Sequence, residues 1–112
     1  MNKFIVAFRG LLDACKDKSV FIQLILGWMA LGAGLVLTFS LMEMIAVILC
    51  IGLVVTTEML NTCIELVCNR STVEQDDAIG RIKAMAAGAV LFSSMIALVV
   101  AVLIFLKHVG GF

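Results

Sequence analysis

Three long apolar runs alternate with short polar stretches along the chain. The runs cover approximately residues 20–39, 44–68 and 85–106. Each has the roughly 20 residues that a helix needs to cross the hydrocarbon of a membrane, so the pattern predicts three transmembrane helices. Residues 1–18 follow a different pattern, in which apolar side chains recur at helical spacing among charged ones. The apolar positions of this segment are Phe4, Phe8, Leu11, Leu12 and Cys15.

These elements predict an all-α fold in one membrane domain over residues 1–112. We expect an integral membrane three-helix bundle with an amphipathic surface helix at its amino terminus. Such a helix either anchors the chain parallel to the membrane or covers a site as a flap, and the pattern fits both. The composition agrees, because a chain that is 63% hydrophobic and has no proline is too apolar for a soluble domain of this size.

The basic residues gather on one side of the predicted membrane. Four of them precede the first apolar run, three lie in the polar connection over residues 69–84, and Lys107 alone follows the third run. The positive-inside rule therefore places the amino terminus and this connecting loop on the cytoplasmic side of the membrane. The formal net charge is zero, which gives no reason to expect nucleic acid as a partner.

Two carboxylates and one amide interrupt the second apolar run. Glu58, Asn61 and Glu65 are spaced i, i+3 and i+7, which places all three on one face of a helix. A charged side chain at membrane depth costs about 2.5–3.5 kcal/mol on insertion scales, so such residues normally face protein and mark a functional site. Polar side chains also hold the helices of an oligomer together through hydrogen bonds. The two carboxylates favour function, and packing is the alternative.

The depths of these side chains suggest different chemical roles. Asn69 and Glu65 lie near the cytoplasmic surface, whereas Glu58 lies about 10 Å deeper at 1.5 Å per residue. A carboxylate near water suits Mg²⁺, which commonly takes one or two protein carboxylates together with substrate phosphates. The deeper carboxylate, partly removed from water, is a candidate general base. Glu43, at the other end of the same run, is interpreted as a solvated helix start.

The same face belongs to a longer pattern. The run Glu58-Met59-Leu60-Asn61-Thr62-Cys63-Ile64-Glu65 is followed, after the basic connection, by Gly80-Arg81-Ile82-Lys83-Ala84-Met85-Ala86-Ala87-Gly88. Together with Ala7-Phe8-Arg9-Gly10 and Glu43, these residues resemble the prokaryotic diacylglycerol kinase family, which includes the undecaprenol kinases. The resemblance implies a homotrimer of three-span subunits whose active sites are shared between neighbours. It also implies transfer of the γ-phosphate of MgATP to the hydroxyl of a membrane lipid, either diacylglycerol, giving phosphatidic acid, or undecaprenol.

The resemblance also implies a role for each matching residue. Glu58 would be the catalytic base on the lipid hydroxyl, and Asn61 would help to position the phosphate and the base. Glu65 would ligate Mg²⁺, and Lys83 would contact the phosphates of ATP. The residues implied at the nucleotide are Arg9, Glu65, Asn69 and Lys83, and those implied as metal ligands are Glu65 and Asp17.

Three positions depart from the family pattern. Asn69 and Ala84 stand where the family has aspartates, and Asp17 is the shorter counterpart of a metal-binding glutamate. A second interpretation is therefore a catalytically impaired relative with a structural or regulatory role in the membrane. A third interpretation, a small proton- or cation-conducting assembly, is weaker because the other two runs have no matching acidic or polar face. Ordinary apolar residues do not distinguish diacylglycerol from undecaprenol as the acceptor.

Overall fold

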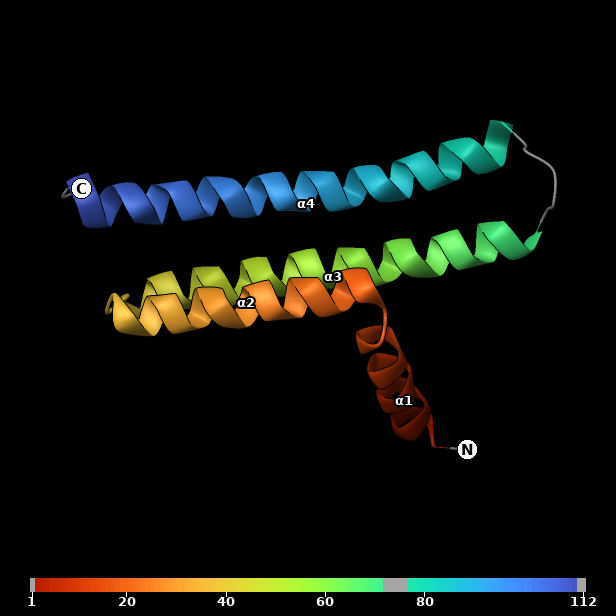
Figure 1. Ribbon diagram of the computed structural model, residues 1–112, viewed down its shortest axis with the longest axis horizontal. Coiled ribbons are helices and arrows are strands. Elements are labelled where there is room, and N and C mark those ends of the chain that lie inside the picture. Colours follow the sequence, from red (N-terminus) through yellow and green to blue (C-terminus); the bar gives the residue numbers. More distant parts are fainter. Residues whose placement is uncertain (1, 72–76, 111–112) are drawn as a thin grey trace.

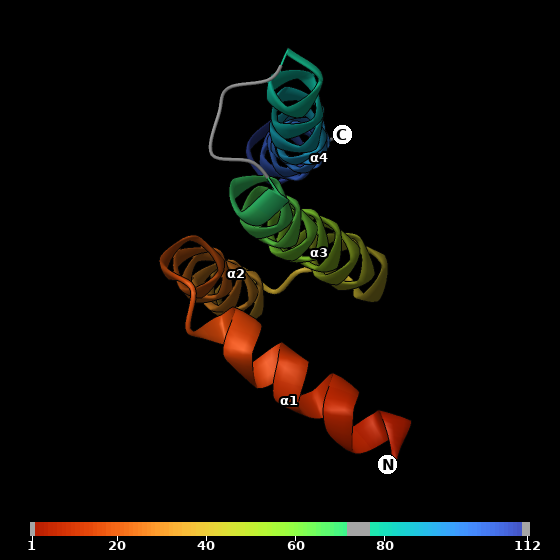
Figure 2. The same ribbon diagram turned by 90° about the vertical axis from the view of Figure 1, so that its right-hand side faces the viewer.

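The chain folds into four helices and no strand in the part that a computed structural model describes, residues 2–71 and 77–110. The helices are α1 (Lys3–Cys15), α2 (Lys18–Val36), α3 (Leu41–Ser71) and α4 (Asp77–Gly110) (Figure 1). Helix α3 lies between α2 and α4 and packs against both, as the view along the bundle shows (Figure 2). The prediction of an all-helical fold with three long helices is confirmed.

Helices α2, α3 and α4 are each long and apolar enough to cross a membrane. The 19 residues of α2 span about 28 Å, close to the hydrocarbon thickness of roughly 30 Å. The 31 residues of α3 span about 46 Å and the 34 residues of α4 about 51 Å, so both helices extend beyond their apolar runs. The expected loop over residues 69–84 is therefore wrong in its described part, where α3 continues to Ser71 and α4 begins at Asp77.

Two buried glycines let α2 and α3 approach closely. A Cβ atom added at Gly27 would lie 2.8 Å from Cγ2 of Ile51, and one added at Gly34 would lie 2.8 Å from Sδ of Met44. Because real Cβ atoms do not come this close to other atoms, a larger residue at either position would displace the facing side chain or the helix that carries it. Small residues at helix contacts are the usual means of close packing in membranes.

This pairing sets the level at which α2 begins. The two helices are antiparallel, with Gly27 opposite Ile51. Val20, seven residues before Gly27, is therefore level with Glu58, seven residues after Ile51. Beyond the start of α2, α3 and α4 continue side by side (Figure 1). We call this part of the bundle the Glu65 end, and the opposite part, which holds the turn between α2 and α3, the Glu43 end.

Among the described residues, four polar contacts between side chains join α3 to α4, and all four fit one antiparallel register. They are Lys83 with Asn69, Ser93 with Thr57, and both Lys107 and His108 with Glu43. The contacts are distributed over most of the shared length of the two helices. Since apolar side chains alone slide easily past one another in lipid, polar contacts of this kind fix the axial position of α4 on α3.

Helix α1 leads away from the bundle. It begins after Asn2, whose Oδ1 accepts a hydrogen bond from the N–H of Phe4 at 2.9 Å. In both views α1 projects from the start of α2 and diverges from α3 and α4 (Figures 1 and 2). None of its residues is buried. The placement of α1 on a membrane surface and the assembly of three chains stay predictions.

Most of the large apolar side chains that the structure describes are exposed, and the buried apolar ones among them are few: Val20, Val54, Cys68 and Ala86. This distribution is the reverse of that in a soluble domain. It fits helices whose outer surfaces contact lipid or further protein.

Candidate functional site

Glu58 is a residue of low exposure whose carboxylate has no partner in the described part of the chain. It lies on α3 at the level where α2 begins, and its exposed fraction is 9%. The structure gives its carboxylate no hydrogen bond or ion pair with any residue that it describes. Removing an unpaired carboxylate from water is costly, by several kcal/mol in an apolar environment. A molecule that donates a hydrogen bond to Glu58 would offset that cost.

Asn61 and Glu65 follow Glu58 on the same face of α3. Nδ2 of Asn61 donates to Oε1 of Glu65 at 3.1 Å. Oδ1 of Asn61 is buried and has no donor in the described chain. Glu65 itself is exposed. The face thus presents acceptor oxygens that lack donors, which suits hydroxyl groups and a hard cation.

Lys83 approaches this region from α4. Its Nζ donates to Oδ1 of Asn69 at 3.0 Å. The amide oxygen orients the ammonium group without neutralising it, so Lys83 keeps its positive charge at the Glu65 end of the bundle. A compact, fully charged ammonium group is a suitable partner for a phosphate.

The structure does not bring every expected residue to this face. Arg9 is exposed on α1, which diverges from α3 and α4 in both views (Figures 1 and 2). Asp17 is half-buried at the start of α2, where its Oδ2 accepts a hydrogen bond from the N–H of Val20 at 3.4 Å. The α2–α3 pairing places Asp17 level with Asn61. Within one chain, therefore, Asp17 lies near the depth of the face and Arg9 lies apart from it.

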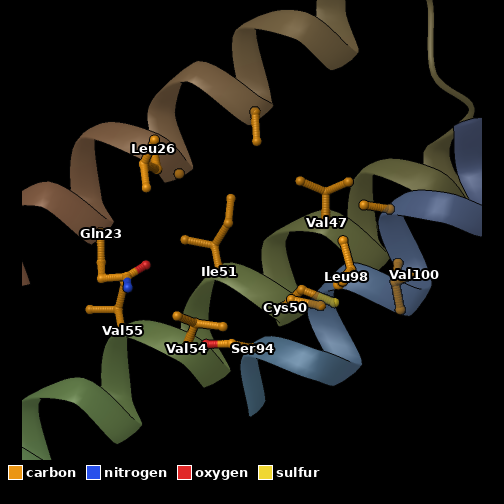
Figure 3. Close-up of a pocket in the computed structure, with 14 residues that line it drawn as sticks. Gln23, Leu26, Val47, Cys50, Ile51, Val54, Val55, Ser94, Leu98 and Val100 are labelled. Carbon is orange, nitrogen blue, oxygen red and sulfur yellow. The ribbon is translucent and has the colours of Figure 1, made fainter. Parts of the chain in front are cut away.

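An apolar groove leads to the same face from inside the membrane. The groove, of about 360 Å³, is bordered by α2, α3 and α4 (Figure 3). A stripe with spacings of four and three residues connects it to the polar side chains on α3: Val47, Ile51, Val54, Glu58, Asn61 and Glu65. The corresponding stripe on α4 is Ala101, Ala97, Ser94, Val90, Ala87 and Lys83. Because one helical face carries each stripe, the groove and the polar groups form one continuous surface.

Glu43 corrects the interpretation made from the sequence. It is only 8% exposed, and therefore not solvated. Its Oε1 accepts from the N–H of Ser40 at 2.8 Å, and the Ser40 hydroxyl accepts from the N–H of Glu43 at 3.2 Å. Lys107 Nζ lies 3.4 Å from Oε1 and His108 Nε2 lies 2.9 Å from Oε2. The ring of Phe39 packs on His108 with centroids 5.0 Å apart. The Ser-x-x-Glu spacing of a capping box was a readable signal for part of this cluster.

A divalent cation fits this site only with help from a substrate. No group of three or more His, Cys, Asp and Glu side chains converges within residues 2–71 and 77–110. A cation on Glu65 would take most of its ligands from phosphate and water, which is how Mg²⁺ is usually held. The donor set therefore fits a metal that arrives with a nucleotide.

The fold and the site define a helical protein with three helices suited to cross a membrane and a groove that leads to an acceptor-rich polar face. The model of one protein family, prokaryotic diacylglycerol kinase, matches residues 5–105, and the chain belongs to this family. The resemblance inferred from the motifs is thereby confirmed, and membership suggests a lipid kinase. No curated protein and no solved structure matches the chain.

Proposed function

We propose that this protein is a membrane lipid kinase. It transfers the γ-phosphate of MgATP to the hydroxyl of a membrane lipid, either diacylglycerol, giving phosphatidic acid, or undecaprenol. The observation that carries the proposal is the carboxylate of Glu58, a residue of low exposure, which has no donor in the described chain and lies where an apolar groove meets a polar face. A lipid hydroxyl is the group that supplies a donor at that depth.

The acceptor lipid enters through the groove. Its chain lies along the apolar stripe of α3, which reaches Glu58 one turn beyond Val55, the last residue of the groove on that helix. The lipid hydroxyl then donates to the Glu58 carboxylate. Oδ1 of Asn61 is buried without a donor. It accepts a hydrogen bond from a second donor group of the reactants, next to the base.

The phosphate donor binds at the Glu65 end of the bundle. Glu65 is exposed, and Lys83 is charged and oriented by Asn69. Glu65 would hold the Mg²⁺ of MgATP, and the metal would neutralise charge on the transferred phosphate. Asp17 is a further candidate ligand and Arg9 a candidate contact to the nucleotide, for which a neighbouring subunit would have to bring α1 to the site.

The chemical step needs one base and no covalent intermediate. Glu58 accepts the proton of the lipid hydroxyl while the oxygen of that hydroxyl forms a bond to the γ-phosphorus. The bond from that phosphorus to the β–γ bridging oxygen breaks, and ADP leaves with the electron pair. Lys83 offsets charge on the phosphate oxygens, so the protein contributes positioning, one proton transfer and electrostatic stabilisation.

The proposal includes an assembly and an orientation. A single chain leaves much apolar surface exposed, and α1, which carries Arg9, diverges from α3, which favours a homotrimer with sites completed by neighbours. Membership of a prokaryotic family favours a bacterial inner membrane, and the distribution of basic residues favours an orientation with the amino terminus and the Glu65 end in the cytoplasm, where ATP is found.

Lipid phosphorylation in mixed micelles tests the proposal. Purified protein is given Mg²⁺ and γ-labelled ATP, with diacylglycerol and undecaprenol offered separately. Glu58→Gln serves as the inactive variant, and Glu43→Gln, the same substitution in the paired carboxylate of the same helix, serves as the control. We expect label on at least one lipid with the wild-type protein and with Glu43→Gln, and none with Glu58→Gln.

Absence of transfer to either lipid from a folded assembly would overturn the proposal. The impaired relative, with Asn69 and Ala84 in place of family aspartates, would then be the better description. Asn69→Asp together with Ala84→Asp would test that description, because recovery of transfer would locate the defect at these two positions.

A further inference from the structure

Gln23 is a half-buried residue in the apolar helix α2, and its side-chain amide has no partner among the described residues. It lines the apolar groove and lies beside Val55 at one end of it (Figure 3). The structure gives its side chain no hydrogen bond with any residue of the described ranges. It lies five residues beyond the start of α2, about 7.5 Å along the helix. An amide at this depth without a partner is unfavourable, because lipid tails offer it neither donors nor acceptors.

The position of Gln23 relative to Glu58 restricts what can satisfy it. The α2–α3 pairing puts Gln23 level with Val55, and Glu58 lies three residues further along α3, about 4.5 Å along the axis. A group bonded to Gln23 therefore lies within one helical turn of the lipid hydroxyl at Glu58. The amide carries one carbonyl acceptor and two N–H donors, and its donors call for a hydrogen-bond acceptor close to that hydroxyl.

The two proposed acceptors differ in this respect. In diacylglycerol an ester carbonyl stands on the carbon next to the one that carries the hydroxyl. In undecaprenol the hydroxyl is followed by hydrocarbon alone, with no acceptor beside it. Only the glycerol ester provides both the donor for Glu58 and an acceptor for Gln23.

We infer that Gln23 is a specificity-determining residue that donates a hydrogen bond to an ester carbonyl of the lipid in the groove. This inference rests on the proposed function for the identity of the groove's ligand. Gln23 selects glycerol esters over polyprenols, because its amide keeps an unsatisfied donor when the bound lipid has no carbonyl group. A site built to hydrogen-bond a substrate group discriminates strongly against analogues that lack it.

A binding measurement without ATP tests the inference. The full-length protein in detergent micelles is titrated with dioctanoylglycerol and, separately, with its diether counterpart dioctylglycerol. The two lipids share chain length and hydroxyl, and the diether has no carbonyl groups. We expect the wild-type protein to bind the diester about tenfold more tightly, as one hydrogen bond of ordinary strength would give. Gln23→Leu, which keeps a similar volume, should bring the ratio of the two dissociation constants close to one.

Leu26→Ala is the matched control on the same wall of the groove, one turn away. It removes apolar contact without touching a hydrogen bond, so it should weaken both lipids alike and keep their ratio. Gln23→Met replaces Gln23→Leu if the leucine variant elutes as an aggregate. Equal binding of the two lipids by the wild-type protein, or a diester preference that survives loss of the amide, would overturn the inference.

The outcomes separate this inference from the proposed function. Preference for the diester without phosphate transfer would support the role of Gln23 and overturn the proposed kinase function. Phosphate transfer without preference for the diester would support the kinase function and overturn the role of Gln23. A change of oligomeric state in Gln23→Leu, with no change in the binding ratio, would show that the amide pairs with a second copy of the chain instead.

Discussion

Helix α3 carries two buried carboxylates that the chain treats in opposite ways. Glu43 and Glu58 are about equally shielded, at 8% and 9% exposed. Glu43 is held by the Ser40 backbone, Lys107 and His108, whereas the Glu58 carboxylate has no partner in the described chain. Burial alone thus says little about role. The paired carboxylate closes the end of the bundle, and the unpaired one is available to a ligand.

Glu58→Gln should have the largest effect on activity. The amide keeps the shape of the side chain and cannot accept a proton as a base, so we expect lipid phosphorylation to fall by about 10²–10⁴-fold. Stability should not fall, because the substitution removes an unpaired buried charge. The rate of label transfer and the thermal unfolding midpoint in detergent together measure both effects. Full activity in a variant that is less stable than the wild type would make Glu58 a structural residue like Glu43.

The two lysines at opposite ends of α4 extend the comparison. Lys83 donates to the neutral amide of Asn69, whereas Lys107 is paired with the carboxylate of Glu43. We expect Lys83→Met to lower kcat/KM for MgATP by about 10²-fold through loss of a charge near the transferred phosphate. Lys107→Met, the control, should change stability more than kinetics. Equal kinetic losses in the two variants would contradict a nucleotide role for Lys83.

Much of the fold is readable from the sequence because hydropathy reports depth in a membrane. The three apolar runs were found in order, and the face of Glu58, Asn61 and Glu65 followed from spacing alone. The ends of the helices were not found, since hydropathy does not report helicity outside the hydrocarbon. Residues 77–84, which include the charged Asp77, Arg81 and Lys83, are helical in α4, where α3 packs against α4.

The pairing of buried polar groups was beyond the reach of sequence patterns. His108 is 65 residues from Glu43 along the chain, so nothing local indicates their contact. Glu58 and Glu43 have the same side chain in the same apolar run, and only the packed structure shows which one has partners. In the sequence Gln23 is only a polar residue within the first apolar run, and the structure shows that it lines the groove.

Glu43→Gln should change stability more than activity. The amide keeps an acceptor for Ser40 and loses the charge that attracts Lys107 and His108. Because hydrogen bonds to charged groups contribute about 1.5–3 kcal/mol, and Lys107 is half-exposed, we expect a loss of about 1–2 kcal/mol. Unfolding by a denaturing detergent measures it. The double variant Glu43→Gln/His108→Gln is the check: if the two side chains are coupled, its loss will be smaller than the sum of the single losses.

The smallest effect is expected where α3 and α4 meet between these two carboxylates. Ser93 is 2% exposed, and its hydroxyl lies 2.9 Å from that of Thr57, the residue next to Glu58. Each hydroxyl also donates within its own helix, Ser93 to the carbonyl of Val90 and Thr57 to that of Val54, when it is not the donor of the shared bond. Hydrogen bonds between membrane helices average about 0.6 kcal/mol, so Ser93→Ala should destabilise the protein by about that amount. Ser94→Ala, on the neighbouring face that lines the groove, is the matched control and should cost less in the same unfolding assay. A loss of several kcal/mol in Ser93→Ala would mean that this contact, rather than the Glu43 cluster, fixes α4 on α3.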